Sequence, residues 1–412
     1  MTDDRLTSVG IESVGVYCGV AAVDVPALFR ARGLDDKRRE NLMMRRKSVA
    51  LPCEDVVTFA ATAARPLLDA LTPPERAAIE LVVVGTESAV DWGRSASSFL
   101  HGLLGLGRSC RLFEVKQACY GGMAALQTAC ALIAASPRPG ARALVVGADV
   151  ASPMRETYME PSQGAGAVAL LVGRAPRVAV PDPGAYGCYS YDAGDGMRPL
   201  REHDIFDVDL SLLTYLDCLR HSWAEYATVV DGADIVDTFH RLALHTPFAG
   251  MVKGAHRSLL RSLRRLPEAG IEDDFAMRVQ PSLVYPSEVG NIYSGTLLLA
   301  LASSIEHTPD EGYRTGLFSY GSGCASEFAS AVIPAGARAA VAQAQIAGQL
   351  DARADLSVAA YDQVIEQTPA AGTEDAKLGP QAADELTGGR LSARKAAVLS
   401  SVRGFRREYA WT

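Results

Sequence analysis

The sequence predicts an α/β fold in which helices cover a parallel sheet. Two short apolar runs, LVVV at 81–84 and ALVV at 143–146, are rich in valine and each is followed by glycine, a pattern typical of buried strands. Between them, residues 121–135 (GGMAALQTACALIAA) are long and alanine-rich enough to form a helix. A strand, a helix and a strand in this order indicate a parallel sheet with helical cover.

Two pairs of segments resemble each other and predict a duplicated architecture. Residues 163–172 and 321–333 both begin with spaced glycines and continue with small and apolar residues, and apolar helices are expected to open at Cys119 and at Asn291. A chance likeness between segments rich in small residues is the alternative. The expected halves are residues 1–175, which carry Glu87 and Cys119, and residues 176–412, which carry His245, Asn291 and Ser322.

Composition excludes several classes of protein. The 412 residues are 48% hydrophobic and 21% charged, as in an ordinary globular enzyme, and the net charge of -8 gives no support for a nucleic-acid binder. The eight cysteines include no CxxC pair, so we expect reduced thiols in a cytoplasmic protein. The acidic N-terminus is unlike a secretory signal, and no apolar run is long enough to span a membrane.

Cys119 lies in KQACYGGMAALQ, directly after the strand-like segment RLFEV and at the start of the expected helix. Backbone N–H groups and the positive end of the helix dipole would point at the sulfur, which lowers the pKa of a thiol and offers a site for an oxyanion. Gly121 and Gly122 would let a substrate approach the backbone closely. A buried, unreactive cysteine is the alternative, and the local sequence does not decide between the two.

Two further residues lie where a strand is expected to end. Glu87 follows LVVVGT, at the edge where active sites of open α/β sheets gather, and a partly buried carboxylate there could remove a proton from carbon next to a thioester. His245 stands in LALHTPF, at a turn from an apolar strand to a helix that Pro247 is expected to start. A capping acid and a structural histidine are the alternatives. His256 is expected on the surface of the helix that follows.

Six motifs, GTES, EVKQACYGG, QGAGAVALL, HTPF, SEVGNIYSG and SYGSG, stand in the order seen in 3-hydroxy-3-methylglutaryl (HMG)-CoA synthases, which the chain therefore resembles over nearly its whole length. The resemblance implies a thiolase-like, layered αβαβα fold of two duplicated halves, assembled as a homodimer. It implies Cys119 as the nucleophile that carries an acyl group, Glu87 as general base and acid, and His245 as the group that polarises the second substrate. Asn291 and Ser322 would line the acyl site.

A narrower resemblance is to the HMG synthase homologues that insert β-branches in bacterial polyketide assembly lines, carried by ENLMMRRKSVALPCEDVVTFA, HTPFAGMVKGAHR and FRREYAW. In the mevalonate enzymes a lysine thought to contact coenzyme A commonly stands two residues after HTPF, whereas this chain has Gly250. The resemblance therefore implies an acetyl-loaded donor acyl carrier protein and an acceptor carrier as partners. It implies no bound cofactor, because the phosphopantetheine thioester of a carrier or of CoA is itself the substrate.

Such carriers are acidic, so a chain with net charge -8 needs a local basic surface to bind them. Lys253 is a candidate contact for the phosphate of the arm. Two basic segments are candidate docking surfaces, although solvated charge is the simpler interpretation of each. The first comprises Lys37, Arg38, Arg39, Arg45, Arg46 and Lys47, and the second Arg257, Arg261, Arg264 and Arg265.

The residues and the resemblance together predict an acyltransferase that adds an acetyl-derived carboxymethyl branch to the β-ketone of a carrier-bound polyketide through an acyl-Cys119 intermediate. Three alternatives remain open at this point. One is a mevalonate-pathway HMG-CoA synthase that uses acetyl-CoA and acetoacetyl-CoA. The others are a catalytically silent scaffold of the thiolase fold and a Cys/His hydrolase that forms no carbon–carbon bond.

Overall fold

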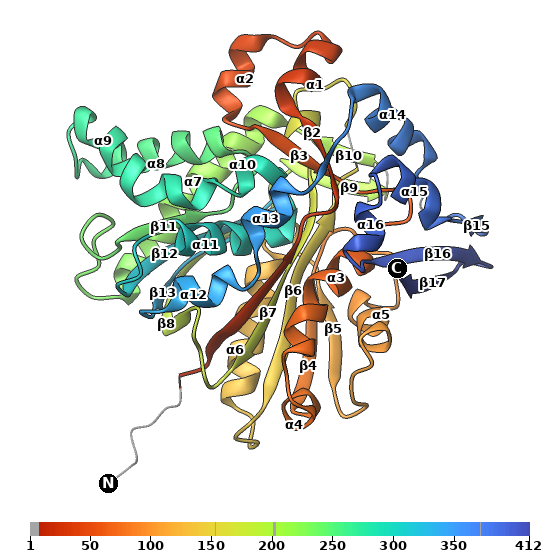
Figure 1. Ribbon diagram of the computed structural model, residues 1–412. Helices are drawn as coiled ribbons and strands as arrows, with labels where there is room; N and C mark the ends of the chain where they lie inside the picture. The colour runs from red at the N-terminus through yellow and green to blue at the C-terminus, as the bar shows by residue number, and fades with distance from the viewer. Residues whose placement is uncertain (1–7, 153, 201–202, 371) are drawn as a thin grey trace.

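The computed structural model describes residues 8–152, 154–200, 203–370 and 372–412, and two sheets form its centre (Figure 1). The first sheet has the strand order β1-β7-β6-β4-β5 and the second the order β11-β12-β13-β8. The first sheet consists of β1 (Gly10–Tyr17), β4 (Ile79–Gly85), β5 (Arg111–Val115), β6 (Arg142–Val150) and β7 (Ala165–Gly173). The second consists of β8 (Val180–Ser190), β11 (Arg241–Leu244), β12 (Tyr313–Gly321) and β13 (Ala325–Ile333).

Helices form the other three layers of the molecule. One central layer between the sheets consists of α6 (Gly121–Ala134) and α11 (Thr296–Glu306), which pack against each other and each against its own sheet. The outer face of the first sheet is covered by α3 (Val56–Asp69), and that of the second by α7 (Val208–Val229) and, behind β11, α8 (Ala249–Leu263). The expected layered αβαβα arrangement is therefore confirmed.

The two sheets repeat one pairing pattern, which confirms the duplication. Strand β4 pairs parallel to β6, which pairs antiparallel to β7, which pairs antiparallel to β1. In the second sheet β11, β12, β13 and β8 pair in the same sequence of directions. Strand β5 is an additional parallel strand at the edge of the first sheet. The self-similar segments of the sequence lead into β7 and β13, and the boundary near residue 175 stays a prediction.

The predicted strands and the helix after Cys119 are confirmed, with three local corrections. Asn291 does not open α11, because a 3₁₀ turn precedes that helix, which begins at Thr296. Helix α8 begins at Ala249, two residues after Pro247. His256 is buried rather than on the surface, because the segment after α8 folds back over it and Asp274 lies 2.7 Å from its Nε2.

The remaining elements frame the ends of the strands and the C-terminal part of the chain. They are β2 (Ala21–Asp24), α1 (Val25–Arg32), α2 (Asp36–Leu42), β3 (Arg46–Val49), α4 (Pro73–Ala77), α5 (Ala96–Leu103), η1 (Glu160–Ser162), β9 (Gly196–Leu200), β10 (His203–Phe206), α9 (Glu268–Asp274), η2 (Phe275–Val279), η3 (Gln280–Leu283), α10 (Pro286–Val289), η4 (Tyr293–Gly295), α12 (Ala337–Ala342), α13 (Ile346–Asp351), β14 (Ala354–Asp355), α14 (Val358–Gln367), β15 (Ala376–Lys377), α15 (Pro380–Leu386), α16 (Arg390–Ala393), β16 (Ala397–Arg403) and β17 (Arg406–Trp411). Among the residues described, no helix combines the length and apolar character needed to cross a membrane.

Candidate active site

A cavity of about 620 Å³ brings together the five residues predicted for catalysis and the acyl site, and lies at the end of the molecule that carries α2. Glu87, Cys119, His245, Asn291 and Ser322 all line it. The duplication explains part of this convergence, because Glu87 follows β4 and His245 follows β11, the corresponding strand of the other half. The carboxyl ends of both sheets thus supply the site.

The backbone around Cys119 is shaped to present the sulfur at the start of α6. Ala118 has a φ of +42°, in the left-handed region that side chains rarely adopt, and its carbonyl accepts a hydrogen bond of 3.1 Å from Ser294 Oγ. A Cβ at Gly321 would lie 2.4 Å from the carbonyl oxygen of Gln117, so only glycine lets the two loops approach this closely. Cys119 is therefore fixed by loops from both halves.

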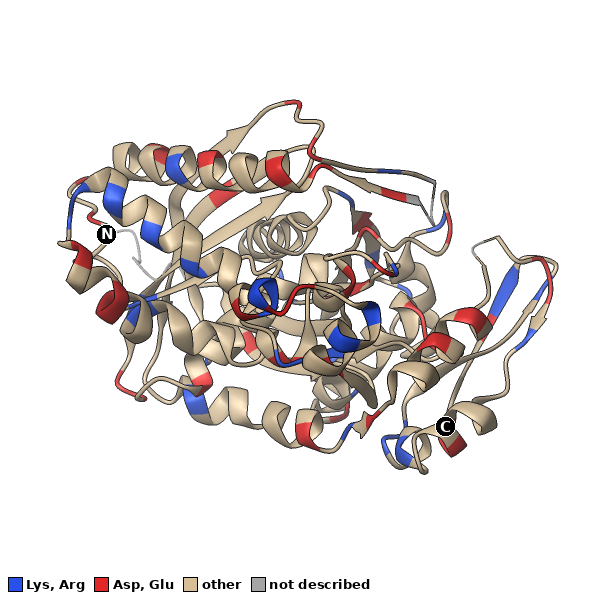
Figure 2. Cartoon of the chain, turned by 90° about the horizontal axis from the view of Figure 1, so that it is seen from above, with Lys and Arg blue, Asp and Glu red and all other residues tan. Residues whose placement is uncertain are grey.

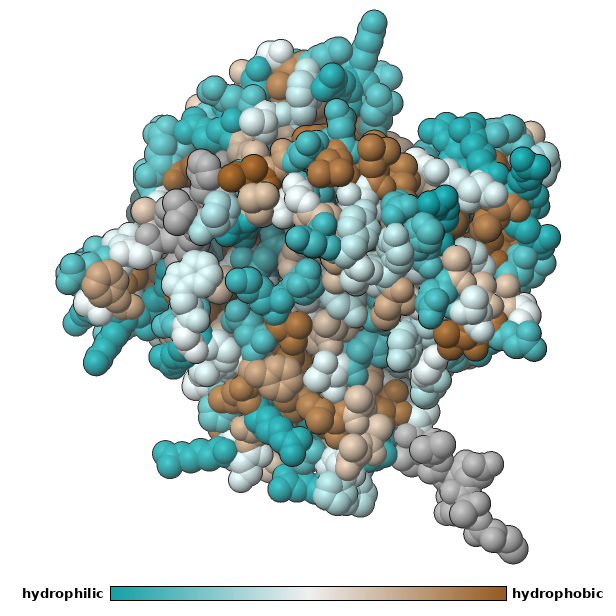
Figure 3. Space-filling model, turned by 180° about the vertical axis from the view of Figure 1, so that it is seen from behind, coloured by the Kyte–Doolittle hydropathy of each residue, from teal (hydrophilic) through white to brown (hydrophobic). Residues whose placement is uncertain are grey.

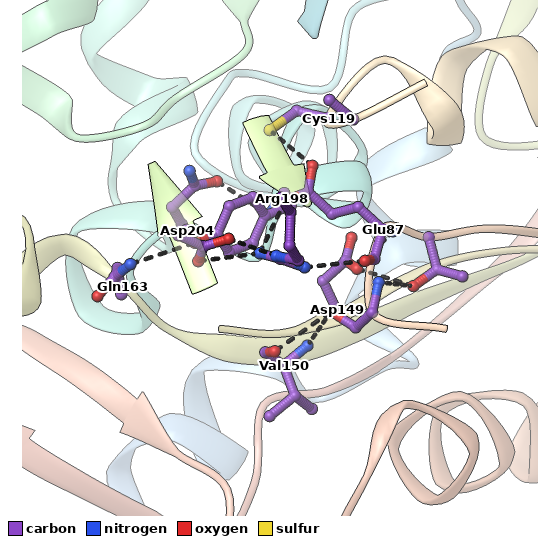
Figure 4. Close-up of polar contacts among 12 residues, drawn as sticks. Glu87, Cys119, Asp149, Val150, Gln163, Arg198 and Asp204 are labelled. Carbon is purple, nitrogen blue, oxygen red and sulfur yellow. Dashed lines mark hydrogen bonds and ion pairs between the residues drawn. The ribbon is translucent and has the colours of Figure 1, made fainter. Parts of the chain in front are cut away.

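Cys119 and Glu87 point toward each other across the cavity (Figure 4). The Sγ of Cys119 donates a long hydrogen bond of 3.9 Å to Oε2 of Glu87. Burial, followed by the negative charges of Glu87 and Asp149, raises the pKa of the Cys119 thiol well above its ordinary value. This corrects the expectation that the helix start lowers it: two nearby carboxylates and loss of solvent outweigh the helix dipole. The thiol is the resting form, and a neighbouring base must take its proton.

Glu87 is held by a buried acid that the sequence analysis did not identify. Asp149, at the end of β6, accepts hydrogen bonds from Thr86 Oγ1 at 2.7 Å, from the backbone N–H of Glu87 at 2.8 Å and from the N–H of Ser294 at 2.9 Å. Burial and the charge of Asp149 raise the pKa of Glu87 to about 8. A carboxyl group that titrates near neutrality can both take and return a proton.

Arg198 contacts Glu87 from the β9–β10 hairpin, and it was also missed. Its Nη1 donates to the carbonyl oxygen of Glu87 at 2.8 Å, and its Nη2 lies 3.2 Å from Oε1 of the Glu87 carboxylate. The same guanidinium is ion-paired with Asp204 on the partner strand of the hairpin (Figure 4). The side chains of Arg198, Glu87 and Asp204 are 16%, 15% and 2% exposed, so this charged group is largely withdrawn from water.

His245 is buried in the wall of the cavity and is neutral. Burial lowers its pKa to about 3, and within the described residues its Nδ1 has no hydrogen-bond partner. The backbone positions it: its N–H donates to the carbonyl of Phe318 at 2.7 Å, and Tyr215 donates its hydroxyl to the His245 carbonyl at 2.7 Å. A neutral imidazole can polarise a carbonyl through one ring nitrogen without adding a charge to the site.

Asn291 and Ser322 complete the wall from the second half. Oδ1 of Asn291 accepts from the N–H of Tyr293 at 2.8 Å and from Thr296 Oγ1 at 2.9 Å, which fixes the plane of the carboxamide beside the cavity. Ser322 follows β12 directly, on the turn between β12 and β13. Both positions bring small polar groups to the cavity without filling it.

Lys253 lies away from this cavity. It does not line the cavity, and its Nζ forms an ion pair of 2.7 Å with Glu272. Gly250, one turn earlier in α8, packs against α2 so closely that a Cβ there would lie 1.7 Å from the carbonyl oxygen of Asn41. A side chain at this position requires α2 to move, which gives a physical reason for the glycine.

Among the basic residues proposed for docking, Arg38 lines the cavity. Lys47 is buried and donates to the Glu160 carbonyl at 2.8 Å, so it is wrong as a surface residue, whereas Arg38 is exposed. The second group, on the last turns of α8 and the two residues after it, begins roughly 9 Å along the helix from Met251, which does line the cavity. Basic and acidic segments both occur on the face seen from above (Figure 2), and in the second group Arg261 pairs with Glu268 and Arg265 with Asp234, so part of its charge is neutralised.

Family models match most of the chain. The model described as hydroxymethylglutaryl-coenzyme A synthase N terminal matches residues 5–177, and the model for the C terminal of the same enzyme matches residues 268–390. Together these segments carry Glu87, Cys119, Asn291 and Ser322. His245 lies between the two matched segments.

Individual proteins are similar over nearly the full length. The polyketide biosynthesis 3-hydroxy-3-methylglutaryl-ACP synthase PksG of Bacillus subtilis is 43% identical, over 98% of this chain and 100% of its own. The hydroxymethylglutaryl-CoA synthase of Enterococcus faecalis is 35% identical over 88% of this chain and 92% of its own. The HMG synthase of the curacin biosynthetic pathway, solved in complex with an acetyl donor-ACP, superposes with a TM-score of 0.95 at 43% identity, over 98% of this chain and 100% of that one.

Proposed function

Because this chain belongs to the hydroxymethylglutaryl-CoA synthase family and has its thiolase-like fold, we propose that it is an acyltransferase that forms a β-branch on a carrier-bound polyketide. The observation that carries the proposal is the cavity shared by Cys119, Glu87 and His245, in which the thiol and the carboxyl group lie 3.9 Å apart. Of the relatives that are 43% identical, PksG is named for polyketide biosynthesis and for an ACP-bound product, and the curacin pathway enzyme was solved with an acetyl donor-ACP. The partner is accordingly an acyl carrier protein.

The first half-reaction loads the enzyme. Cys119 loses its proton, its sulfur attacks the carbonyl carbon of the acetyl thioester on the donor carrier, and backbone N–H groups at the start of α6 stabilise the oxyanion. The bond from the acetyl carbon to the carrier sulfur breaks, and the carrier leaves as a free thiol with the proton. The raised pKa of Cys119 makes a base necessary, and Glu87 is the nearest candidate.

The second half-reaction forms the branch. Glu87 removes a proton from the methyl group of acetyl-Cys119, and the resulting enolate attacks the β-ketone of the acceptor chain. Neutral His245 donates a hydrogen bond to that ketone and assists delivery of the proton that makes the tertiary alcohol. Water then cleaves the Cys119 thioester, which frees the thiol and leaves a carboxymethyl branch on the acceptor.

The proposed carriers fit the mouth of the cavity. Arg38, on α2, is exposed, lines the cavity and lies 4.4 Å from the centre of the Tyr158 ring. Its charge suits an acidic carrier whose phosphopantetheine arm reaches Cys119. Gly250 supports the same preference, because α2 occupies the place where a lysine side chain for coenzyme A would begin. A second carrier as acceptor, a homodimer and a cytoplasmic location stay predictions.

Intact-protein mass spectrometry tests the proposal. After incubation with an acetyl-loaded carrier, we expect a mass increase of one acetyl group that disappears in Cys119→Ala. In Glu87→Gln, acetylation should survive, with slower loading, while condensation with a β-ketoacyl carrier fails. Acetylation that persists in Cys119→Ala contradicts the assignment of the nucleophile. Equal turnover with acetyl-CoA and acetoacetyl-CoA as with carriers would instead favour a mevalonate-type enzyme.

A further inference from the structure

We propose that Arg198, which is ion-paired with Asp204, is a positioning residue that orients the Glu87 carboxylate and favours its ionised, proton-accepting form. The inference rests on the proposed function, because it assigns a partner to the proposed base. Arg198 does not touch Cys119 in any contact of the described structure. It acts through Glu87.

The geometry divides the two oxygens of Glu87 between two partners. Oε1 faces the Nη2 of Arg198 at 3.2 Å, and Oε2 faces the Sγ of Cys119 at 3.9 Å. The second Arg198 nitrogen, Nη1, donates to the Glu87 backbone carbonyl at 2.8 Å, so the guanidinium contacts both the main chain and the side chain of Glu87. A carboxylate held at one oxygen presents the other to the thioester with little freedom to rotate.

The charges around Glu87 give Arg198 a second effect. The ionisable groups that face Glu87 come from β6, β9, β10, η4 and the loop before α6, and Arg198 is the cation among them; they are Cys119, Asp149, Arg198, Asp204 and Tyr293. Burial and the two aspartates raise the pKa of Glu87, and the positive charge of Arg198 lowers it. Removing the cation therefore leaves a carboxyl group with a higher pKa, so a smaller fraction of it is in the ionised, proton-accepting form at a given pH.

The β9–β10 hairpin is built with its charged side chains facing inward. Met197 and Ile205 pair directly across the hairpin and are 50% and 43% exposed, whereas the side chains of Arg198 and Asp204, on the opposite face, are 16% and 2% exposed. Figure 3 shows exposed hydrophobic residues in both the upper and the lower part of the surface seen from behind. Strands normally bury their apolar residues and expose their charged ones. The inverted pattern favours a role for the ion pair in the site, since a buried ion pair is weak evidence for stability.

Deuterium exchange on the acetylated enzyme isolates the step that Arg198 is proposed to affect. The chain is acetylated on Cys119 from an acetyl-loaded carrier, moved into D₂O without acceptor, quenched and digested, and the mass of the acetyl-Cys119 peptide is followed across pH. Exchange requires Glu87 to take a methyl proton and return a deuteron, so the acid limb of the rate profile reports the ionisation of Glu87.

Variants should move this limb in opposite directions. Arg198→Met should move the acid limb of the rate profile to a pH higher by one unit or more. At a fixed pH on the acid side of the profile, exchange should then be about tenfold slower than in the wild type. Asp204→Asn should shift the limb downward, because the anion that raises the pKa of Glu87 is removed. Arg198→Lys should restore much of the limb position and less of the maximum rate, since lysine keeps the charge and lacks the forked donor. Arg314→Met breaks the Arg314–Asp182 pair outside the cavity and should leave the limb unchanged.

An unmoved limb in Arg198→Met, or shifts of the same sign in Arg198→Met and Asp204→Asn, overturns the inference. If Arg198→Met does not fold or does not accept acetyl, Asp204→Asn decides, and an unmoved or raised limb there is the contrary result. A wild-type chain that never becomes acetylated on Cys119 contradicts the proposed function itself. The two failures are therefore distinguishable.

Discussion

Glu87→Gln should make the protein more resistant to unfolding as the pH rises, although we expect it to abolish condensation. Burial and Asp149 raise the pKa of Glu87 from 4.5 to about 8 in the folded chain. Between these two values the folded protein holds a proton that the unfolded chain releases, so the wild type loses stability with increasing pH. Each pH unit in this interval lowers the free energy of unfolding of the wild type by about 1.4 kcal/mol, so the full interval lowers it by on the order of 5 kcal/mol. The variant has no carboxyl group at position 87 and does not undergo this loss.

Urea unfolding of both proteins at intervals from pH 5 to pH 9 measures this difference. The lost contact with Arg198 adds a constant offset to the variant, so the informative quantity is the change with pH in the difference between the two free energies of unfolding. We expect the variant to gain on the wild type up to about pH 8 and the difference to level off above it. A difference that does not change with pH would show that Glu87 has an ordinary pKa, and the reasoning about its burial would be refuted.

Three other predictions concern the same region. Gly122→Ala should lower the free energy of unfolding by about 2 kcal/mol or more, because its Cβ would lie 1.9 Å from a carbonyl oxygen of η4. The control Gly254→Ala, inside α8, has open space around its Cβ and should raise the free energy of unfolding by about 0.5–1 kcal/mol. Chemical unfolding of both variants measures the two changes. Since burial lowers the pKa of His245 to about 3, the wild type should lose about 3 kcal/mol relative to His245→Gln between pH 6.5 and pH 4.5, and equal losses would contradict a buried neutral histidine. At pH 9, Glu87→Gln should speed alkylation of Cys119 by iodoacetamide, because the carboxylate raises the pKa of the thiol; Cys119→Ala gives the background, and an unchanged rate speaks against the coupling.

Much of the architecture was predictable because the strands and the central helices have strong local patterns. The runs at 81–84 and 143–146 are buried on both faces of a sheet and are therefore uniformly apolar, which is what made them recognisable. Cys119, Glu87 and His245 were predictable for a related reason. Each comes within four residues of the end of a strand, and strand ends are where a sheet brings side chains to a common edge.

Asp149 follows the same rule and was identifiable by it. It lies near the end of β6 in VVGADV, just as Glu87 follows LVVVGT, yet no local feature marks it as an acceptor of three hydrogen bonds. Arg198 and Asp204 had no such pattern. Their pairing depends on a hairpin between β8 and α7 that folds over the site, a contact between distant segments.

The predicted direction of the Cys119 pKa shift was wrong for a similar reason. Local sequence indicates a helix start, which favours a thiolate, but the two carboxylates that oppose it come from β4 and β6 and are brought close only by the sheet. His256 was misjudged because the segment after α8 returns to cover it with Asp274. In each case an interaction between distant segments decided the outcome.

The contact between Gly250 and Asn41 constrains how a protein of this shape can change its preference between a tethered and a free thioester. The two residues lie on α8 and α2, in different halves of the chain, and any side chain at position 250 collides with the α2 backbone. A single mutation to lysine would cost folding before it could gain a contact with coenzyme A. A lysine at position 250 therefore requires the segment around α2 to change with it, and exchanging this one residue alone should destabilise the protein.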